Sequence, residues 1–287
     1  MYRWLLILWA IPCAAIELPD MGTSANTVLS QADEKKLGET FIRQLRQQLE
    51  VIEDVQIDNY INALGHRLAS YSSNPEQPFQ FFVIKAPSIN AFAVPGGFIG
   101  IHSGLILKTR SESELASVLA HEIAHVTQRH IARTIQASQN LSVPAMAALI
   151  VAGIIAGVAG APQVGQAAIT AAMAGRVQMQ INFTRTHEKE ADRVGMETLA
   201  NAGFDPRDMP KFFDRLQAAM RYYENGIPDF LRTHPVTTER IAEAQDRADK
   251  YPKQLVNNSP LYHLMKAQLL VLTTDNKHKL LKIFLMC

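Results

Sequence analysis

Apolar side chains recur at helical spacing along much of the chain. In two early stretches, 30–49 and 57–68, they repeat every three or four positions with polar residues between them. This spacing places the apolar residues on one face of a helix, so it predicts two amphipathic helices. The same pattern predicts further helices at 112–136 and 211–223, and another from Thr237 onwards.

A short stretch between these helices has the composition of β-strands. Residues 79–85 are rich in aromatic and β-branched side chains. Residues 90–94 and 98–101 flank Pro95-Gly-Gly97, which is a turn sequence. The pattern as a whole therefore predicts an α+β fold that is mainly helical and contains a small sheet.

The helix predicted at 112–136 contains His121-Glu122-Ile123-Ala124-His125, an instance of H-E-x-x-H. Ser111 and Glu114 form an S-x-x-E capping box at its start. Residues four apart share a helix face, so both imidazoles can reach one point, where two histidine nitrogens suit Zn²⁺. Glu122 stands beside that point and can take a proton from bound water. Two solvated surface histidines are the alternative.

A second pair of residues four apart can supply the third ligand expected of a zinc enzyme. Glu188 and Asp192 share one face of a predicted helix. This spacing suits Glu188 as a metal ligand and Asp192 as an acceptor that orients a ligand imidazole. His187 is a competing ligand, whereas Glu190 and His130 face elsewhere on their helices and are predicted to be solvated.

These motifs carry a family resemblance. HEIAH at 121–125 and EKEAD at 188–192 resemble the gluzincin metallopeptidases of the CAAX-prenyl-protease and HtpX type, whose third ligand is the Glu of an E-x-x-x-D motif. The similarity extends over residues 18–267. It implies a zincin-like metallopeptidase domain over 16–255, with the sheet beside the H-E-x-x-H helix. It also implies that His121, His125 and Glu188 hold one Zn²⁺ per chain and that the chain hydrolyses peptide bonds.

The resemblance extends to the first of the strands that flank the turn sequence. Asn90, Ala91, Phe92 and Ala93 resemble the family segment that binds substrate as a sheet edge. An edge strand next to a metal can pair with an extended peptide through its backbone, which allows broad sequence tolerance. A place in the core is the alternative for this stretch.

A histidine and an arginine late in the chain complete the predicted site. His234 and Arg240 suit stabilisation of the oxyanion in a tetrahedral transition state. His234 could instead occupy the open zinc position and hold the enzyme latent until substrate displaces it. Without the two metal motifs, His234 would be interpreted as a loop residue before Pro235.

Three segments bear on location. Residues 1–15 have the basic start and apolar run of a secretory signal peptide, which predicts export to the periplasm. Residues 141–175 carry no charged side chain. We favour a packed helical hairpin or a lid there over a membrane span, and a peripheral membrane contact remains open. The resemblance implies that residues 256–287 are a remnant of a tetratricopeptide-repeat region, and a divergent basic tail is the alternative.

The chain is nearly neutral, with 28 Lys and Arg against 27 Asp and Glu, so its charge does not favour nucleic acid. The motif spacing predicts only a hydrolytic zinc site with Glu122 as general base, and the resemblance implies a zinc-dependent endopeptidase of the cell envelope. The resemblance alone supplies its substrates, misfolded or stalled outer-membrane proteins, and a partner, the outer-membrane assembly machinery. Two alternatives are a chaperone-like binding module with a latent site and an integral membrane peptidase of HtpX type.

Overall fold

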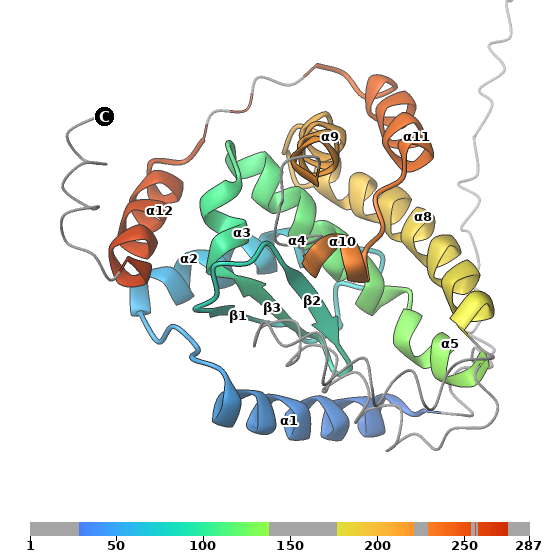
Figure 1. Ribbon diagram of the computed structural model, residues 1–287, viewed down its shortest axis with the longest axis horizontal. Coiled ribbons are helices and arrows are strands. Elements are labelled where there is room, and N and C mark those ends of the chain that lie inside the picture. The colour runs from blue at the N-terminus through green and yellow to red at the C-terminus, as the bar shows by residue number, and fades with distance from the viewer. Residues whose placement is uncertain (1–28, 138–176, 221–228, 254–255, 257, 275–287) are drawn as a thin grey trace, which may run out of the picture.

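The computed structural model describes residues 29–137, 177–220, 229–253, 256 and 258–274 (Figure 1). Its three-stranded sheet has the order β1-β3-β2. The strands are β1 (Gln80–Ile84), β2 (Ala91–Val94) and β3 (Phe98–His102). β3 pairs with β1 in parallel and with β2 in antiparallel orientation, so β2 is an edge strand. These strands confirm the three stretches predicted from composition.

The turn between β2 and β3 depends on glycine. Gly96 and Gly97 both have a φ of 85°, in the left-handed region that favours this residue. A Cβ at Gly97 would lie 2.0 Å from the carbonyl oxygen of Pro78. The turn sequence therefore holds β2 and β3 together at the edge of the sheet.

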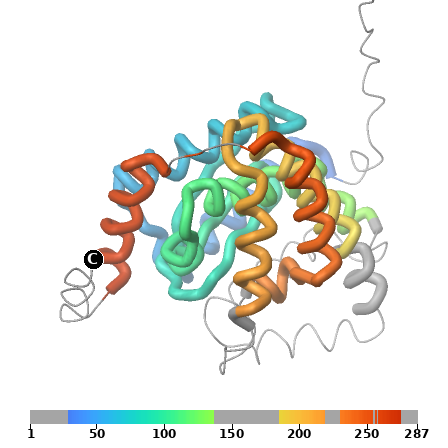
Figure 2. Tube along the Cα trace, turned by 90° about the horizontal axis from the view of Figure 1, so that it is seen from above, coloured from blue at the N-terminus to red at the C-terminus, as the bar shows by residue number. Residues whose placement is uncertain are grey.

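Ten helices accompany the sheet in the described part of the chain, which confirms a mainly helical α+β fold. They are α1 (Gln31–Gln48), α2 (Val55–Ala69), α3 (Ser103–Lys108), α4 (Glu112–Thr127), α5 (His130–Ala137), α8 (Val177–Asn201), α9 (Asp208–Met220), α10 (Asp229–Thr233), α11 (Thr238–Asp249) and α12 (Pro260–Thr273). Figures 1 and 2 place α9 and α11 side by side, and the two helices are in contact.

Helix α4 lies at the centre of the fold and contacts α2, α8, α9 and β2 (Figure 1). Its apolar residues Leu115, Leu119 and Ile123 are fully buried in the main core. The predicted capping residue Ser111 accepts a hydrogen bond from the N–H of Glu114 at 3.1 Å. The Glu114 carboxylate accepts one from the N–H of Arg110 at 2.6 Å, one residue earlier than in the usual capping box. The helix that carries the H-E-x-x-H motif is thus held from all sides.

The sheet is covered on both faces. One face packs into the main core with α2 and α4, and the other packs against α1 in a second apolar cluster. That cluster includes Phe41 and Leu45 of α1, together with Phe82 and Phe92 of the sheet. Both the covering helices and the sheet follow from the apolar spacing, since each element buries one predicted face.

The predicted continuous helix over 112–136 is wrong. Helix α4 ends at Thr127, and α5 begins at His130 after a turn in which Arg129 has a φ of 52°. This backbone conformation costs a non-glycine residue about 1–2 kcal/mol. The Arg129 side chain offsets that cost because it donates to the carbonyl oxygen of Leu29 at 2.6 Å and to the carboxylate of Glu34 at 3.0 Å.

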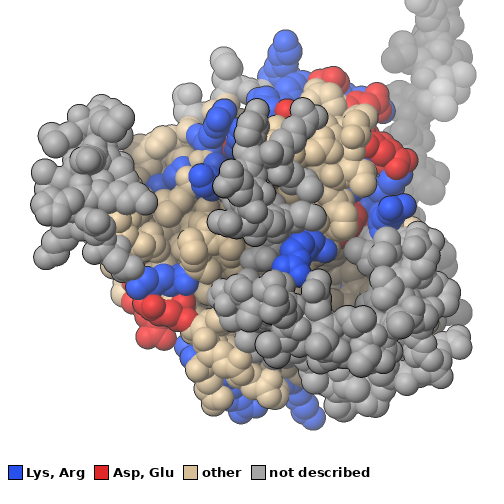
Figure 3. All heavy atoms as spheres, in the orientation of Figure 1, with Lys and Arg blue, Asp and Glu red and all other residues tan. Residues whose placement is uncertain are grey.

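None of the described helices combines the length and the apolar character needed to cross a membrane. The predicted signal peptide and the uncharged stretch 141–175 lie outside the described residues. On the face shown in Figure 3, acidic and basic side chains of the described residues lie near one another rather than in one large patch. Helix α12, in the segment predicted to be a repeat remnant or tail, buries Tyr262, Met265 and Leu269 in the main core.

Candidate metal centre

Two packed helices, α4 and α8, bring the metal-binding motifs together. The Nε2 atoms of His121 and His125 lie 3.0 Å apart on α4. From α8, Glu188 places one carboxylate oxygen 3.3 Å from His121 Nε2 and the other 3.3 Å from His125 Nε2. The close approach of the helices depends on small residues, because a Cβ at Gly195 would already lie 3.0 Å from the backbone of Ala120.

His234 adds a third imidazole to this group. Its Nδ1 lies 3.0 Å from a Glu188 oxygen and 3.4 Å from His121 Nε2. The residue follows α10, and its N–H donates to the carbonyl oxygen of Phe230 at 2.7 Å, while the Phe230 ring stacks on the imidazole. The ligand atoms of His121, His125, Glu188 and His234 all lie within 4.8 Å of one another, and this arrangement fits a metal ion.

Glu122 is buried beside the four candidate ligands. One carboxylate oxygen lies 3.5 Å from His234 Nε2. Burial raises the pKa of the Glu122 carboxyl above its ordinary value, and the charges of His234 and His121 oppose this effect without cancelling it. A carboxyl with a raised pKa is better matched to proton transfer near neutral pH, so the environment of Glu122 suits a general base.

Asp192 and Arg240 lie behind His121 and Glu188. Asp192 places an oxygen 3.0 Å from His121 Nδ1, where it can orient the imidazole as the spacing predicted. Arg240 donates from Nε and Nη2 to the two Asp192 oxygens at 2.7 Å, and its Nη1 lies 2.9 Å from Glu188. Burial alone would raise the pKa of Asp192, but the charges and hydrogen bonds of Arg240 and His121 together outweigh burial and lower that pKa.

These contacts give Arg240 partners that the sequence did not predict. Its side chain is buried, and its guanidinium contacts two carboxylates and the carbonyl oxygen of Pro235. The geometry gives Arg240 a positioning place behind Glu188 and Asp192. The late arginine was visible in the sequence, but its partners follow only from the packing of α11 on α8.

The expectation that His130 is solvated is wrong, whereas Glu190 is half-buried. His130 is only 3% exposed, and its Nδ1 lies 2.8 Å from Nδ1 of His125. Its Nε2 lies 3.2 Å from a carboxylate oxygen of Glu190. The argument from helical facing assumed an unbroken helix, and the turn at Arg129 removes that assumption. His187, the competing ligand, stacks on His130 instead of joining the four-residue group.

The predicted substrate residues also lie near this centre. β2 contacts α4, and one side of the strand pairs with β3. Asn90, Ala91 and Phe92 are buried, and Ala93 is half-buried, so this stretch belongs to the core as well as to the sheet edge. The two interpretations of this segment are therefore compatible.

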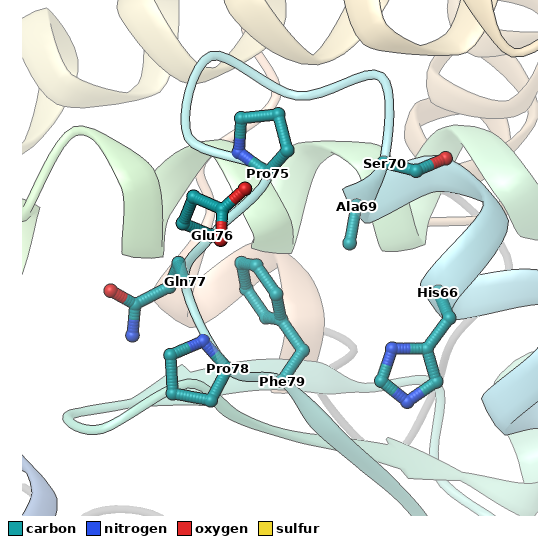
Figure 4. Close-up of a pocket in the computed structure, with 8 residues that line it drawn as sticks. All are labelled: His66, Ala69, Ser70, Pro75, Glu76, Gln77, Pro78 and Phe79. Atoms are coloured by element: carbon teal, nitrogen blue, oxygen red, sulfur yellow. The ribbon is translucent and has the colours of Figure 1, made fainter.

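A separate pocket of about 450 Å³ lies between the end of α2 and the start of β1 (Figure 4). Its lining includes His66 of α2, Pro75 and Pro78 of the connecting loop, and Phe79. None of its lining residues belongs to the metal-binding group.

Comparisons with known proteins agree with this geometry. The chain is 42% identical over 267 residues to the β-barrel assembly-enhancing protease of Escherichia coli (strain K12), covering 93% of this chain and 54% of that relative. It is 40% identical over 253 residues to the Yersinia pestis protein of the same name, covering 88% and 51%. It is 28% identical over 194 residues to the mitochondrial metalloendopeptidase OMA1 of Schizosaccharomyces pombe, covering 65% and 52%.

The chain thus spans about half the length of these curated relatives. The profile of peptidase family M48 matches residues 56–248, a range that contains both metal-binding motifs and His234. The match covers more than half of the chain and runs from α2 to α11. The chain belongs to peptidase family M48.

Proposed function

We propose that the chain is a zinc-dependent endopeptidase that cleaves unfolded or misassembled proteins. The observation that carries the proposal is the convergence of the H-E-x-x-H histidines and Glu188 at one point, with the Glu122 carboxyl buried beside it. The family membership supports a metallopeptidase. A purely structural metal site would leave the position of Glu122 without a purpose.

The donor set supports zinc as the metal. Ligand atoms about 2.0–2.1 Å from a tetrahedral ion lie roughly 3.3–3.4 Å apart. The nitrogen and oxygen atoms of His121, His125, Glu188 and His234 lie 3.0–3.4 Å apart in the pairs that contact one another. When bound, the ion polarises the substrate carbonyl and lowers the pKa of a water molecule toward about 7.

Glu122 is the proposed general base. It takes the proton from the attacking water and delivers it to the leaving amine. Its burial excludes bulk water from competing for that proton. Asp192 fixes the ring of His121, and Arg240 holds both Asp192 and Glu188 in place.

His234 is proposed to hold the site in a latent state. Its Nδ1 lies among the other donors, at the position that a catalytic zinc site keeps open for water or substrate. It must therefore move before the reaction, and a role in stabilising the oxyanion would follow that movement. This placement favours latency for the substrate-free protein.

An extended polypeptide is the proposed substrate form. The free edge of β2 offers backbone N–H and C=O groups that can pair with an added strand. Asn90, Ala91 and Phe92 are buried, so selection of substrate through these side chains would be weak. Broad sequence tolerance is the expected result.

The names of the relatives guide the biological assignment. Because E. coli and Y. pestis relatives are named β-barrel assembly-enhancing proteases, we propose outer-membrane proteins as substrates and their assembly machinery as a partner. The proposal includes a signal peptide at 1–15, a periplasmic location and a peptidase domain at 16–255. Residues 256–287, whose helix α12 packs into the main core, are proposed as a remnant of a repeat region or a divergent basic tail. A chaperone-like binding role is the second candidate, and the position of His234 in the ligand group favours it.

The test is degradation of an unfolded protein by the purified chain with zinc. Glu122→Gln and a chelator are the controls, and zinc content is measured for each protein. Cleavage that disappears in both controls supports the zinc-peptidase proposal. If folded, zinc-loaded wild type does not cleave and His234→Ala does, the result supports latency. Binding of the unfolded protein by zinc-loaded wild type and His234→Ala, with no cleavage by either, would favour the chaperone-like role.

A further inference from the structure

A series of contacting side chains lies behind His125, on the side of the ring away from the other ligands. His125 Nδ1 lies 2.8 Å from His130 Nδ1, and His130 Nε2 lies 3.2 Å from a Glu190 oxygen. The same oxygen of Glu190 accepts a hydrogen bond from Arg133 at 2.8 Å. This series therefore runs from the candidate metal ligand on α4, through α5, to α8.

The direction of these hydrogen bonds follows from their two ends. A histidine that binds a metal through Nε2 carries its proton on Nδ1, so His125 must donate to His130. His130 Nδ1 must then accept, which places the proton of His130 on Nε2, where it donates to Glu190. Glu190 accepts both this bond and the bond from Arg133. One arrangement of protons satisfies every contact in the chain.

Two further contacts fix the place of His130. The turn at Arg129, held by Leu29 and Glu34, starts α5 in the direction that brings His130 back against His125. The His187 ring stacks on His130 with centroids 4.2 Å apart and planes at 7°. These contacts hold the ring in one plane.

We propose that His130, anchored by Glu190, is a positioning residue that fixes the tautomer and orientation of His125 as a metal ligand. The proposal rests on the proposed metal site. It gives His125 the support that Asp192 gives His121. In each case an arginine contacts the supporting carboxylate, which is Asp192 for His121 and Glu190 for His125. The difference is that a second imidazole stands between His125 and its carboxylate.

The test is zinc affinity, measured by competition with a chelator for the purified chain. His130→Phe keeps the ring volume but removes the acceptor, and it should weaken zinc binding about 10- to 100-fold. His130→Asn can place an amide oxygen near the position of Nδ1, so it should recover part of the loss. Glu190→Gln should weaken binding less than His130→Phe. His66→Gln, at an exposed histidine of the separate pocket, should leave the affinity unchanged.

Circular dichroism of each metal-free protein separates positioning from folding. Equal zinc affinity in wild type and a folded His130→Phe protein would overturn the inference while leaving the proposed function intact. His130→Asn binding as weakly as His130→Phe would mean that packing, not the hydrogen bond, sets the affinity, and would also overturn it. If His130→Phe does not fold, unchanged affinity in Glu190→Gln overturns it. A wild type that binds no zinc would overturn the proposed function itself.

Discussion

Removing the guanidinium of Arg240 should leave two buried carboxylates without their cation. Arg240 is 3% exposed, and its partners Asp192 and Glu188 are 6% and 2% exposed. Three of its nitrogen–oxygen contacts with these carboxylates measure 2.7–2.9 Å. Arg240→Met keeps much of the aliphatic stem but removes every one of these contacts, together with the contact of the guanidinium over the Phe213 ring. The variant therefore removes the charge while keeping a side chain of similar length.

Loss of one partner from a buried ion pair costs about 3–5 kcal/mol. Because two carboxylates share Arg240, we expect the substitution to lower the free energy of unfolding of the metal-free protein by about 3–5 kcal/mol at pH 7. Asp192 can limit the loss by taking up a proton, since burial raises its pKa once Arg240 no longer opposes burial. Added zinc should reduce the loss further, because it returns positive charge to Glu188.

The assay is urea unfolding of metal-free wild type and variants, followed by circular dichroism. Lys250→Met, which breaks the exposed pair with Asp246, is the matched control and should leave the midpoint unchanged. Adding Asp192→Asn to Arg240→Met should restore part of the stability, because it removes one unpaired charge. A loss below about 1 kcal/mol, or no recovery in the double variant, would refute the argument that Arg240 neutralises these carboxylates.

Three further predictions concern packing and pH. Gly38→Ala would stabilise an isolated helix by about 1 kcal/mol. Here its Cβ would lie 2.0 Å from the Pro95 carbonyl oxygen, so thermal melting should show a loss, and a higher Tm would contradict this. Gly195→Val should push α8 away from α4 and weaken zinc binding in chelator competition, whereas unchanged affinity would show that the helices can adjust. Burial lowers the pKa of His102 from 6.5 to about 4, so the unfolded chain binds the proton first and stability falls as the pH drops through this interval. From pH 7 to pH 5, the free energy of unfolding measured in urea should fall by about 2 kcal/mol more for wild type than for His102→Gln. Equal decreases in the two proteins would refute the contribution of His102.

The helices and strands could largely be predicted because local signals and buried faces agree. Ser30, Ser111 and Thr237 cap α1, α4 and α11, and each accepts a hydrogen bond from a backbone N–H of the first turn. The break after α4 could not be predicted in this way. Neither Gln128 nor Arg129 is a usual helix-breaking residue, and the contacts that stabilise the turn come from about 95 residues earlier in the chain.

The candidate site could likewise be predicted only where helical spacing determines it. Spacing alone brings His121 and His125 onto one face of α4, and Glu188 and Asp192 onto one face of α8. The partners of Arg240 and His130 depend instead on how separate helices pack, which a spacing argument does not contain. The burial of His130 and the partners of Arg240 were missed for that reason.

The charges of the site give a physical reason for a divalent cation. Helix α8 contributes three carboxylates to the contacts around the ligands, and Glu122 of α4 adds a fourth. Only two guanidinium groups, those of Arg240 and Arg133, contact these carboxylates among the charges described for the site. With the histidines neutral, as metal ligands must be, the group would carry a net charge of minus two. Burial of that charge is unfavourable, and the raised pKa of Glu122 is one consequence of its burial. A bound Zn²⁺ would balance the charge and would allow Glu122 to ionise, which is the state that a general base requires.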